Sequence, residues 1–134
     1  MKTLREALKD WSWLRNLDDM EIVRTSCIGD VILRTASGEE FILDVVGGEL
    51  RAYDEHEKYL LNGESNLMGR MEQHGLTLSP GTCYCLKPHA IFEVHKPDNV
   101  YVGTTSEYVS FLGDFHNRVK DLPDGTKVRF VVKS

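Results

Sequence analysis

The sequence has no hydrophobic run near the roughly 20 residues that span a bilayer, and none of its segments predicts a membrane helix. Its first residues are basic and then acidic, and they lack the apolar core of a signal peptide. It contains only three cysteines and four prolines in 134 residues. An odd number of cysteines without an export signal favours reduced thiols, so we expect a cytoplasmic protein.

Positive charge is also scarce, since the formal net charge is −5. Between Asp30 and Glu57, eight acidic side chains accompany two arginines, whereas the stretch from His116 to Ser134 carries a net charge of +3. Nucleic-acid-binding proteins usually show a dominant basic stripe, so we expect no direct contact with nucleic acid. An acidic face would instead attract a basic protein. The alternative is that these acids only solvate the outer face of a sheet.

Catalytic and cofactor motifs are missing as well. There is no G-x-S-x-G elbow, phosphate-binding glycine loop or H-E-x-x-H helix, and the five histidines are dispersed. Cys83, Cys85, His89 and His95 form C-x-C-x3-H-x5-H, a spacing unlike that of structural zinc sites. Buried thiols and loop histidines explain it better, and His116 is expected to be a hydrogen-bonded core histidine. We therefore expect no enzyme, no metal and no cofactor.

What the sequence does contain is a β-meander from Gly29 to Tyr53. Apolar residues alternate with a period of two, which predicts strands with one buried face. The expected buried-face residues are Val31, Leu33, Phe41, Leu43, Val45, Leu50 and Ala52. Gly38 is expected in the left-handed conformation at one hairpin, and Gly47-Gly48 as a two-residue turn at the next.

The whole chain predicts one α+β domain, with an antiparallel sheet, helices packed on one face and a C-terminal strand. The last helix is expected to begin with a capping box from Thr104 to Glu107. Its apolar stripe comprises Tyr108, Phe111, Leu112, Phe115, Val119 and Leu122. The predicted elements are a helix at 3–16, a sheet at 21–53, helices at 55–74, strands at 82–102, a helix at 105–121 and a strand at 127–133.

Several short motifs occur together in a familiar order. They are Gly29-Asp30-Val31, Leu43-Asp44, Leu78-x-Pro80-Gly81-x-Cys83-Tyr84-x-x-Lys87, and the run from Gly113 and His116 to Leu122-Pro123-x-Gly125-Thr126. In this order the chain resembles the C-terminal domain of the Tdi immunity proteins of the bacterial type VI secretion system. The opening from Asp10 to Leu14 also looks like that of stand-alone members. Each motif alone is ordinary turn chemistry, and the signal lies in their shared order.

The resemblance implies a non-catalytic immunity protein that binds and neutralises a cognate secreted toxin, a DNase in the named family. Because a DNase presents a positive cleft, we expect an acidic contact face. The expected contact residues are Glu39, Glu40, Glu49, Asp54, Glu55 and Glu57. The alternative is a general protein- or small-ligand-binding module without a toxin partner, using a pocket formed by Trp11, Trp13, Tyr84 and the last helix.

Overall fold

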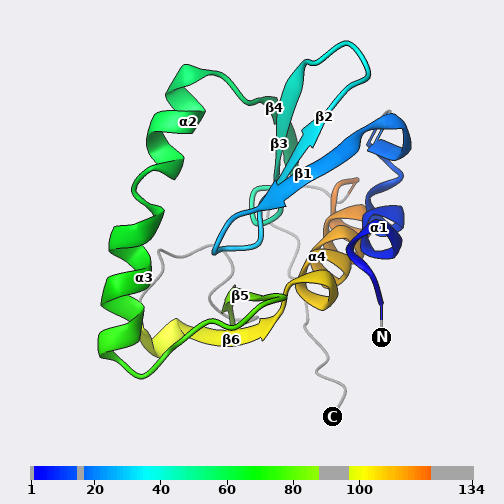
Figure 1. The fold of residues 1–134 in the computed structure, drawn as a ribbon. Coiled ribbons are helices and arrows are strands. Elements are labelled where there is room, and N and C mark those ends of the chain that lie inside the picture. Colours follow the sequence, from blue (N-terminus) through cyan, green and yellow to red (C-terminus); the bar gives the residue numbers. More distant parts are fainter. Residues whose placement is uncertain (1, 15–16, 88–96, 122–134) are drawn as a thin grey trace.

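The structure is a computed structural model that describes residues 2–14, 17–87 and 97–121. Figure 1 shows a four-stranded sheet and a two-stranded ribbon with helices arranged around them, which confirms the α+β class. The elements are α1 (Leu4–Ala7), η1 (Leu8–Trp11), η2 (Leu17–Asp19), β1 (Glu21–Thr25), β2 (Val31–Arg34), β3 (Glu40–Asp44), β4 (Glu49–Ala52), α2 (Glu55–Leu61), α3 (Glu64–Gln73), β5 (Thr82–Leu86), η4 (Pro97–Asn99), β6 (Val100–Thr104) and α4 (Thr105–Val119).

The predicted meander is confirmed. Strands β1 to β4 pair antiparallel in the order of the chain. Val31 lies opposite Leu43, and Leu43 lies opposite Leu50, so these expected apolar residues share one face. Ala52 pairs with Phe41 at the edge strand but is exposed, so the prediction that it is buried is wrong. Gly38 has φ of +92° in the β2–β3 loop, a conformation that glycine adopts without steric cost. Local alternation and turn chemistry therefore suffice to specify this sheet.

The turn between β3 and β4 is longer than predicted. Strand β3 ends at Asp44, and the connection covers Val45 to Gly48 rather than Gly47-Gly48 alone. The Asp44 carboxylate accepts a hydrogen bond from Gly47 N at 2.8 Å, and Asp44 O accepts one from Gly48 N at 2.8 Å. An aspartate that bonds its own turn in this way ends a strand early.

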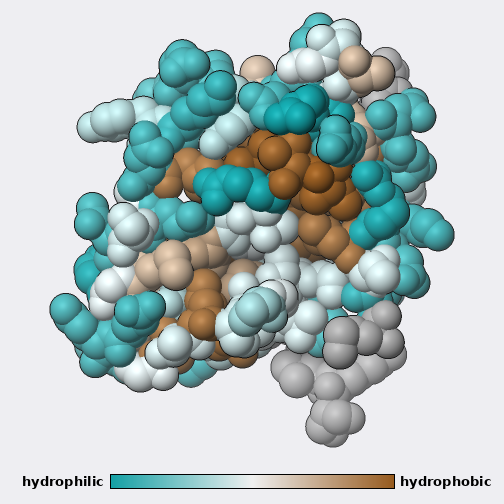
Figure 2. Space-filling view, viewed as in Figure 1, coloured by the Kyte–Doolittle hydropathy of each residue, from teal (hydrophilic) through white to brown (hydrophobic). Residues whose placement is uncertain are grey.

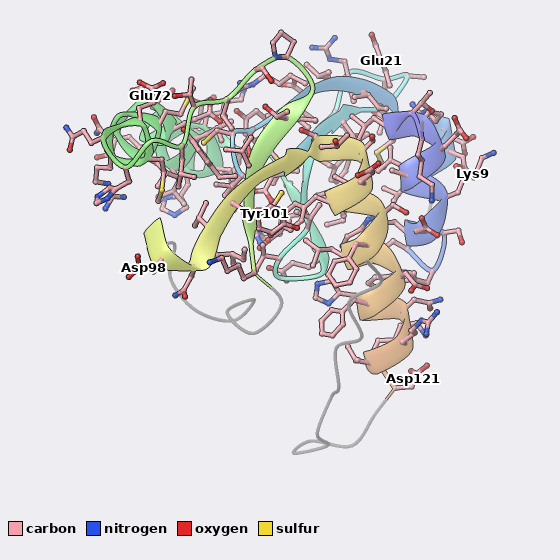
Figure 3. The ribbon with its side chains drawn as sticks, turned by 90° about the horizontal axis from the view of Figure 1, so that it is seen from below. Lys9, Glu21, Glu72, Asp98, Tyr101 and Asp121 are labelled. Atoms are coloured by element: carbon pink, nitrogen blue, oxygen red, sulfur yellow. The ribbon has the colours of Figure 1, made fainter. Side chains whose placement is uncertain are left out.

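The N-terminal helix is shorter than the predicted 3–16. Thr3 and Glu6 form a capping box, and the helix continues as the 3₁₀ turn η1 only as far as Trp11. The Trp11 indole Nε1 donates to Val109 O at 2.8 Å, and the Trp13 indole Nε1 donates to Gly113 O at 3.3 Å. Both tryptophans are thus directed onto α4, as Figure 3 shows for the two neighbouring helices.

Helix α4 buries Tyr108, Leu112 and Phe115 as predicted, but one residue of the predicted stripe is wrong. Phe111 is exposed, whereas Val109, Gly113 and His116 are buried. The cause is η1, because Trp11 takes the space beside Gly113 that a larger side chain would fill. Thr104 is the N-cap residue as predicted, but its side chain makes no capping hydrogen bond.

The β5–β6 ribbon separates two hydrophobic clusters. Cys83 and Cys85 face the main core, where β2 and β3 meet α1, η1 and α4. Tyr84 and Leu86 face the other way, toward a smaller cluster with Met71 of α3. Alternation along one short strand therefore serves both clusters.

Helices α2 and α3 follow the predicted 55–74 span closely. Asp54 caps α2 by accepting a hydrogen bond from Glu57 N at 3.0 Å, and Gly75 follows α3 with φ of +81°. The prediction of helices on one sheet face holds for α1, η1 and α4. Helix α2, by contrast, contacts side chains of the opposite face, including Glu40 and Arg51.

Some predictions fall on residues outside the described ranges. They concern positions 88–96 of the strands predicted at 82–102, the strand at 127–133, Leu122 of the helix stripe, and the loop histidines His89 and His95. Within the described ranges, no helix is long and apolar enough to cross a bilayer.

Candidate binding surface

The outer face of the sheet carries a layer of charged side chains over two buried isoleucines. Ile32 lies opposite Ile42, which in turn lies opposite Arg51. Both isoleucines are almost fully buried. Arg34 lies opposite Glu40 in the same register. Alternation predicts that this face of the sheet is exposed to water. In the structure it is partly buried, because ion pairs cover the two isoleucines.

Arg51 is the centre of this layer. Its guanidinium contacts Glu57 at 2.8 Å, Asp44 at 2.8 Å and Glu49 at 2.6 Å. Hydrogen bonds to Glu57 and Asp44 raise the pKa of Arg51 further above its usual value. One cation from β4 thus joins the end of β3 to the first turn of α2. A guanidinium has several N–H donors in one plane, so it can bind two or more carboxylates at once.

Lys58 forms a second, looser centre. Its ammonium lies 3.7 Å from Glu40 and 3.7 Å from Glu55. It also lies 5.6 Å from the centre of the Tyr53 ring, within range of a cation–π contact. Arg34 contacts the same Glu40 at 3.4 Å. These exposed pairs are individually weak, but they continue the charged layer along α2.

The six predicted contact residues separate into two groups. Glu40 and Glu57 hold α2 to the sheet, and Asp54 caps α2, so these three have structural roles. Glu39, Glu49 and Glu55 are exposed, and the Glu55 side chain is 94% accessible. The expectation that all six present free charge outward therefore needs correction. We call Glu39, Glu49 and Glu55 the acidic rim.

The charged layer keeps a negative excess in spite of its internal pairs. Seven acidic side chains lie on this part of the chain with the three cations Arg34, Arg51 and Lys58, and all of them except Glu39 and Asp54 form ion pairs with those cations. The carboxylates are Glu39, Glu40, Asp44, Glu49, Asp54, Glu55 and Glu57. The sequence gave no sign that Arg51 would pair with Asp44 and Glu57, or Lys58 with Glu40, since these pairs form only through the fold.

Exposed apolar side chains lie beside this layer. On α2, Tyr59 is 74% exposed and Leu60 is 55% exposed. Leu60 also lines a hollow of about 190 Å³ at the α2–α3 junction, together with Cys27, Ile28 and Leu67. Figure 2 shows apolar atoms reaching the surface in the middle of this face, bordered by hydrophilic side chains. Tyrosine and apolar groups inside a polar border are typical of protein contact surfaces.

Glu64 closes the inner side of the hollow. Its carboxylate accepts a hydrogen bond from Cys27 N at 2.6 Å and lies 3.6 Å from Arg24. Burial, followed by the negative charge of Glu64, raises the pKa of the Cys27 thiol to about 12. Cys27 is thus a neutral, hydrogen-bonded thiol rather than a reactive thiolate.

The alternative pocket expected from Trp11, Trp13 and Tyr84 does not form. Trp11 is fully buried and stacks on Trp13 with ring centres 5.5 Å apart. Tyr84 belongs to the smaller cluster, and its hydroxyl donates to Leu76 O at 2.9 Å. The ribbon lies between the two sets, so these aromatic residues are core packing.

Buried cysteines are confirmed at Cys83 and Cys85. Their Sγ atoms lie 3.7 Å apart in the main core. Among the residues that the structure describes, no three histidine, cysteine or acidic side chains are placed to share a metal ion. The hypothesis that these thiols act with His89 and His95 falls partly outside the described ranges.

Asp30 was counted with the surface acids, and this is wrong. It is 8% exposed, and its Oδ1 accepts a hydrogen bond from Val45 N at 3.2 Å. Burial, followed by the charge of Asp44, raises the pKa of Asp30 to about 7. The sequence feature that indicates this burial is the position of Asp30 directly before the buried residues Val31–Leu33.

Comparisons of the chain with protein-family models, with curated proteins and with solved structures give no match. The functional interpretation therefore depends on the surface itself and on the motif order in the sequence.

Proposed function

We propose that the chain is a non-catalytic immunity protein that binds a cationic secreted toxin, such as a DNase, and thereby protects the cell that makes it. The observation that carries the proposal is the negative excess on the charged layer of the sheet and α2, where five carboxylates pair with three cations and Glu39 and Asp54 add two further negative charges. The motif order, which resembles that of the Tdi-type immunity proteins, also supports the proposal. A cytoplasmic location fits this role.

The acidic rim supplies the long-range attraction. Charges at the edge of an interface mainly accelerate association and make it depend on salt. Glu39 at the β2–β3 hairpin, Glu49 on β4 and Glu55 on α2 are exposed and can be reached by lysine or arginine side chains of a partner. Glu49 and Glu55 also contact Arg51 and Lys58 of the charged layer. The pairs beneath the rim keep α2 in place, so that the rim residues form a fixed pattern.

Tyr59 and Leu60 supply the short-range contact. Interface energy is concentrated in a few central residues, among which tyrosine is enriched. Because both side chains already lie exposed beside the rim, a partner could cover them without a rearrangement of the sheet. The complementary partner is a cationic protein whose contact surface has an apolar side chain surrounded by basic residues.

Charge reversal of the acidic rim should weaken this interaction. The triple variant Glu39→Lys, Glu49→Lys and Glu55→Lys should associate with the toxin at least about tenfold more slowly at low salt, with a flatter salt dependence. The measurement is surface plasmon resonance with the product of the adjacent gene, together with growth rescue on co-expression. Glu40 and Glu57 stay unchanged because they hold α2.

A matched control has the same change in net charge elsewhere. Glu21, Glu72 and Asp98 are exposed and lie on other parts of the molecule, as Figure 3 shows. Their replacement by lysine should leave association within about twofold, because steering depends on charge close to the contact. Equal rates for the rim variant and the control would contradict the assigned surface.

The second candidate is a binding module without a toxin partner, which the hollow at the α2–α3 junction favours. Here Leu67→Trp would fill the hollow and remove binding of a small ligand, whereas a toxin held by the acidic rim would still bind. A neighbouring gene product that is not toxic, or whose toxicity the chain does not relieve, favours this second candidate.

A further inference from the structure

Two buried ionisable side chains hold the same residue of the β3–β4 turn. Val45 N donates to Asp30 Oδ1 at 3.2 Å, and Val45 O lies 3.0 Å from His116 Nε2. The two side chains come from positions 86 residues apart, one at the start of β2 and one on α4. Both are at most 9% exposed. The turn is thus held from two sides by groups that can change charge.

The backbone around Asp30 is fixed, so its carboxyl group cannot easily turn toward water. Asp30 N donates to the Ser26 hydroxyl at 3.1 Å, and Asp30 O accepts from Ser26 N at 2.8 Å. On the other side, a Cβ at Gly48 would lie 2.7 Å from His116 Nδ1. The imidazole therefore packs directly against the turn.

The charged and titratable groups near Asp30 come from four elements. Asp44 on β3 and Glu57 on α2 are negative, Arg51 on β4 is positive, and the Cys83 thiol on β5 is close enough to interact. Asp44 is also the charged group that acts on His116. Trp11 and Phe115 contribute only rings around the imidazole. A proton on Asp30 therefore changes the field at Asp44 and Arg51, which belong to the charged layer.

We propose that Asp30 and His116 form a proton-controlled latch on the Val45–Gly48 turn, and that Asp44 transmits the state of the latch to Arg51 and the acidic rim. A change near neutral pH would then alter how firmly the binding surface is ordered. The effect on a partner rests on the proposed function. The latch and its coupling to Arg51 can be measured without any partner.

The two groups respond to pH in opposite directions. Burial raises the pKa of Asp30 from 3.8 to about 7, so its contribution to stability is full below pH 4 and is lost as the pH rises toward 7. Burial lowers the pKa of His116 from 6.5, so its contribution is full above pH 6.5 and is lost as the pH falls through the lowered value. In mild acid both side chains are neutral and neither buried group carries a charge, whereas the hydrogen bonds to Val45 by themselves favour the charged forms.

The direct test is an NMR titration from pH 5 to 8.5 that follows the Val45 amide and the Arg51 Nε–H, which donates to Glu57 at 2.8 Å. Both signals should move with one shared midpoint near pH 7. In Asp30→Asn, which keeps an oxygen for the Val45 amide, that step should disappear. In Asp98→Asn, an exposed control, it should remain.

Stability supplies a second measurement that does not depend on resolved NMR signals. The unfolding equilibrium constant of the wild type, divided by that of Asp30→Asn, should rise roughly 500-fold from pH 4 to pH 8, because only the wild type must ionise a buried carboxyl group. A ratio that stays constant would overturn the latch. A Val45 amide that does not titrate would overturn it as well.

The remaining outcomes separate the latch from the proposed function. If Val45 titrates but Arg51 does not, the latch stands and its coupling to the acidic rim is refuted. If both titrate and no cationic protein binds at either pH 6 or pH 8, the latch stands and the proposed function fails.

Discussion

Gly113→Ala is expected to destabilise the protein by about 2 to 3 kcal/mol, although alanine is the better helix former. A Cβ on Gly113 would lie 2.6 Å from Trp11 Nε1 and 2.9 Å from Asp10 O. The indole cannot retreat, because it is fully buried and its Nε1 donates to Val109 O. The backbone at Asp10 is equally confined. Overpacking of this kind exceeds the gain in helix propensity.

The matched control is Gly69→Ala in α3. No atom lies within 4 Å of a Cβ at Gly69, so the substitution meets open space. It should stabilise the protein by about 0.5 to 1 kcal/mol through helix propensity alone. Urea denaturation of the two variants and the wild type measures both effects. Two shifts of the same sign would show that α4 does not pack on η1 as described.

Arg51→Met is expected to destabilise the protein by about 2 kcal/mol at pH 7. The substitution keeps most of the side-chain volume but leaves Asp44, Glu49 and Glu57 without their shared cation. The Glu57 side chain is only 14% exposed, so water cannot fully replace the guanidinium. Because Arg51 is partly exposed, the expected loss of stability is smaller than that for a fully buried ion pair. The first turn of α2 should loosen from β4.

Two measurements make this prediction specific. Arg34→Met removes one exposed contact, to Glu40 at 3.4 Å, and should cost no more than about 0.5 kcal/mol. Hydrogen exchange should rise in α2 for Arg51→Met but not in α4. In about 1 M salt, which screens partly exposed charges, the loss for Arg51→Met should become smaller. An equal loss at low and high salt would mean that packing, not charge, explains it.

The β-meander and the helix positions could be predicted because their signals are local. Alternation in β2 and β3, a glycine at the hairpin and the Asp54 cap depend on neighbours a few residues away. The errors occur where a distant residue competes. The predicted 3–16 helix ends at Trp11, whose ring contacts α4, and the α4 stripe turns away from Phe111 for the same reason.

In the candidate site, too, the features set by neighbouring residues could be predicted and those set by distant residues could not. The sequence showed that acids gather between residues 39 and 57, because charge density is a property of composition. It did not show that Glu40 and Glu57 would fasten α2 to the sheet, or that Tyr59 and Leu60 would remain exposed beside them. Those facts follow from how α2 lies on the outer face of the sheet.

By itself, the sequence determined an α+β chain with a glycine-turned antiparallel sheet, a negative segment and cysteines suited to a core. Only the tertiary structure decided which acids are paired, that Asp30 is buried, and that His116 reaches the turn at Val45. Strand alternation and turn chemistry depend on residues that are close together in the chain, so they can be recognised in the sequence. Burial and ion pairing act through space, and they join residues as far apart as Asp30 and His116 only after the chain has folded.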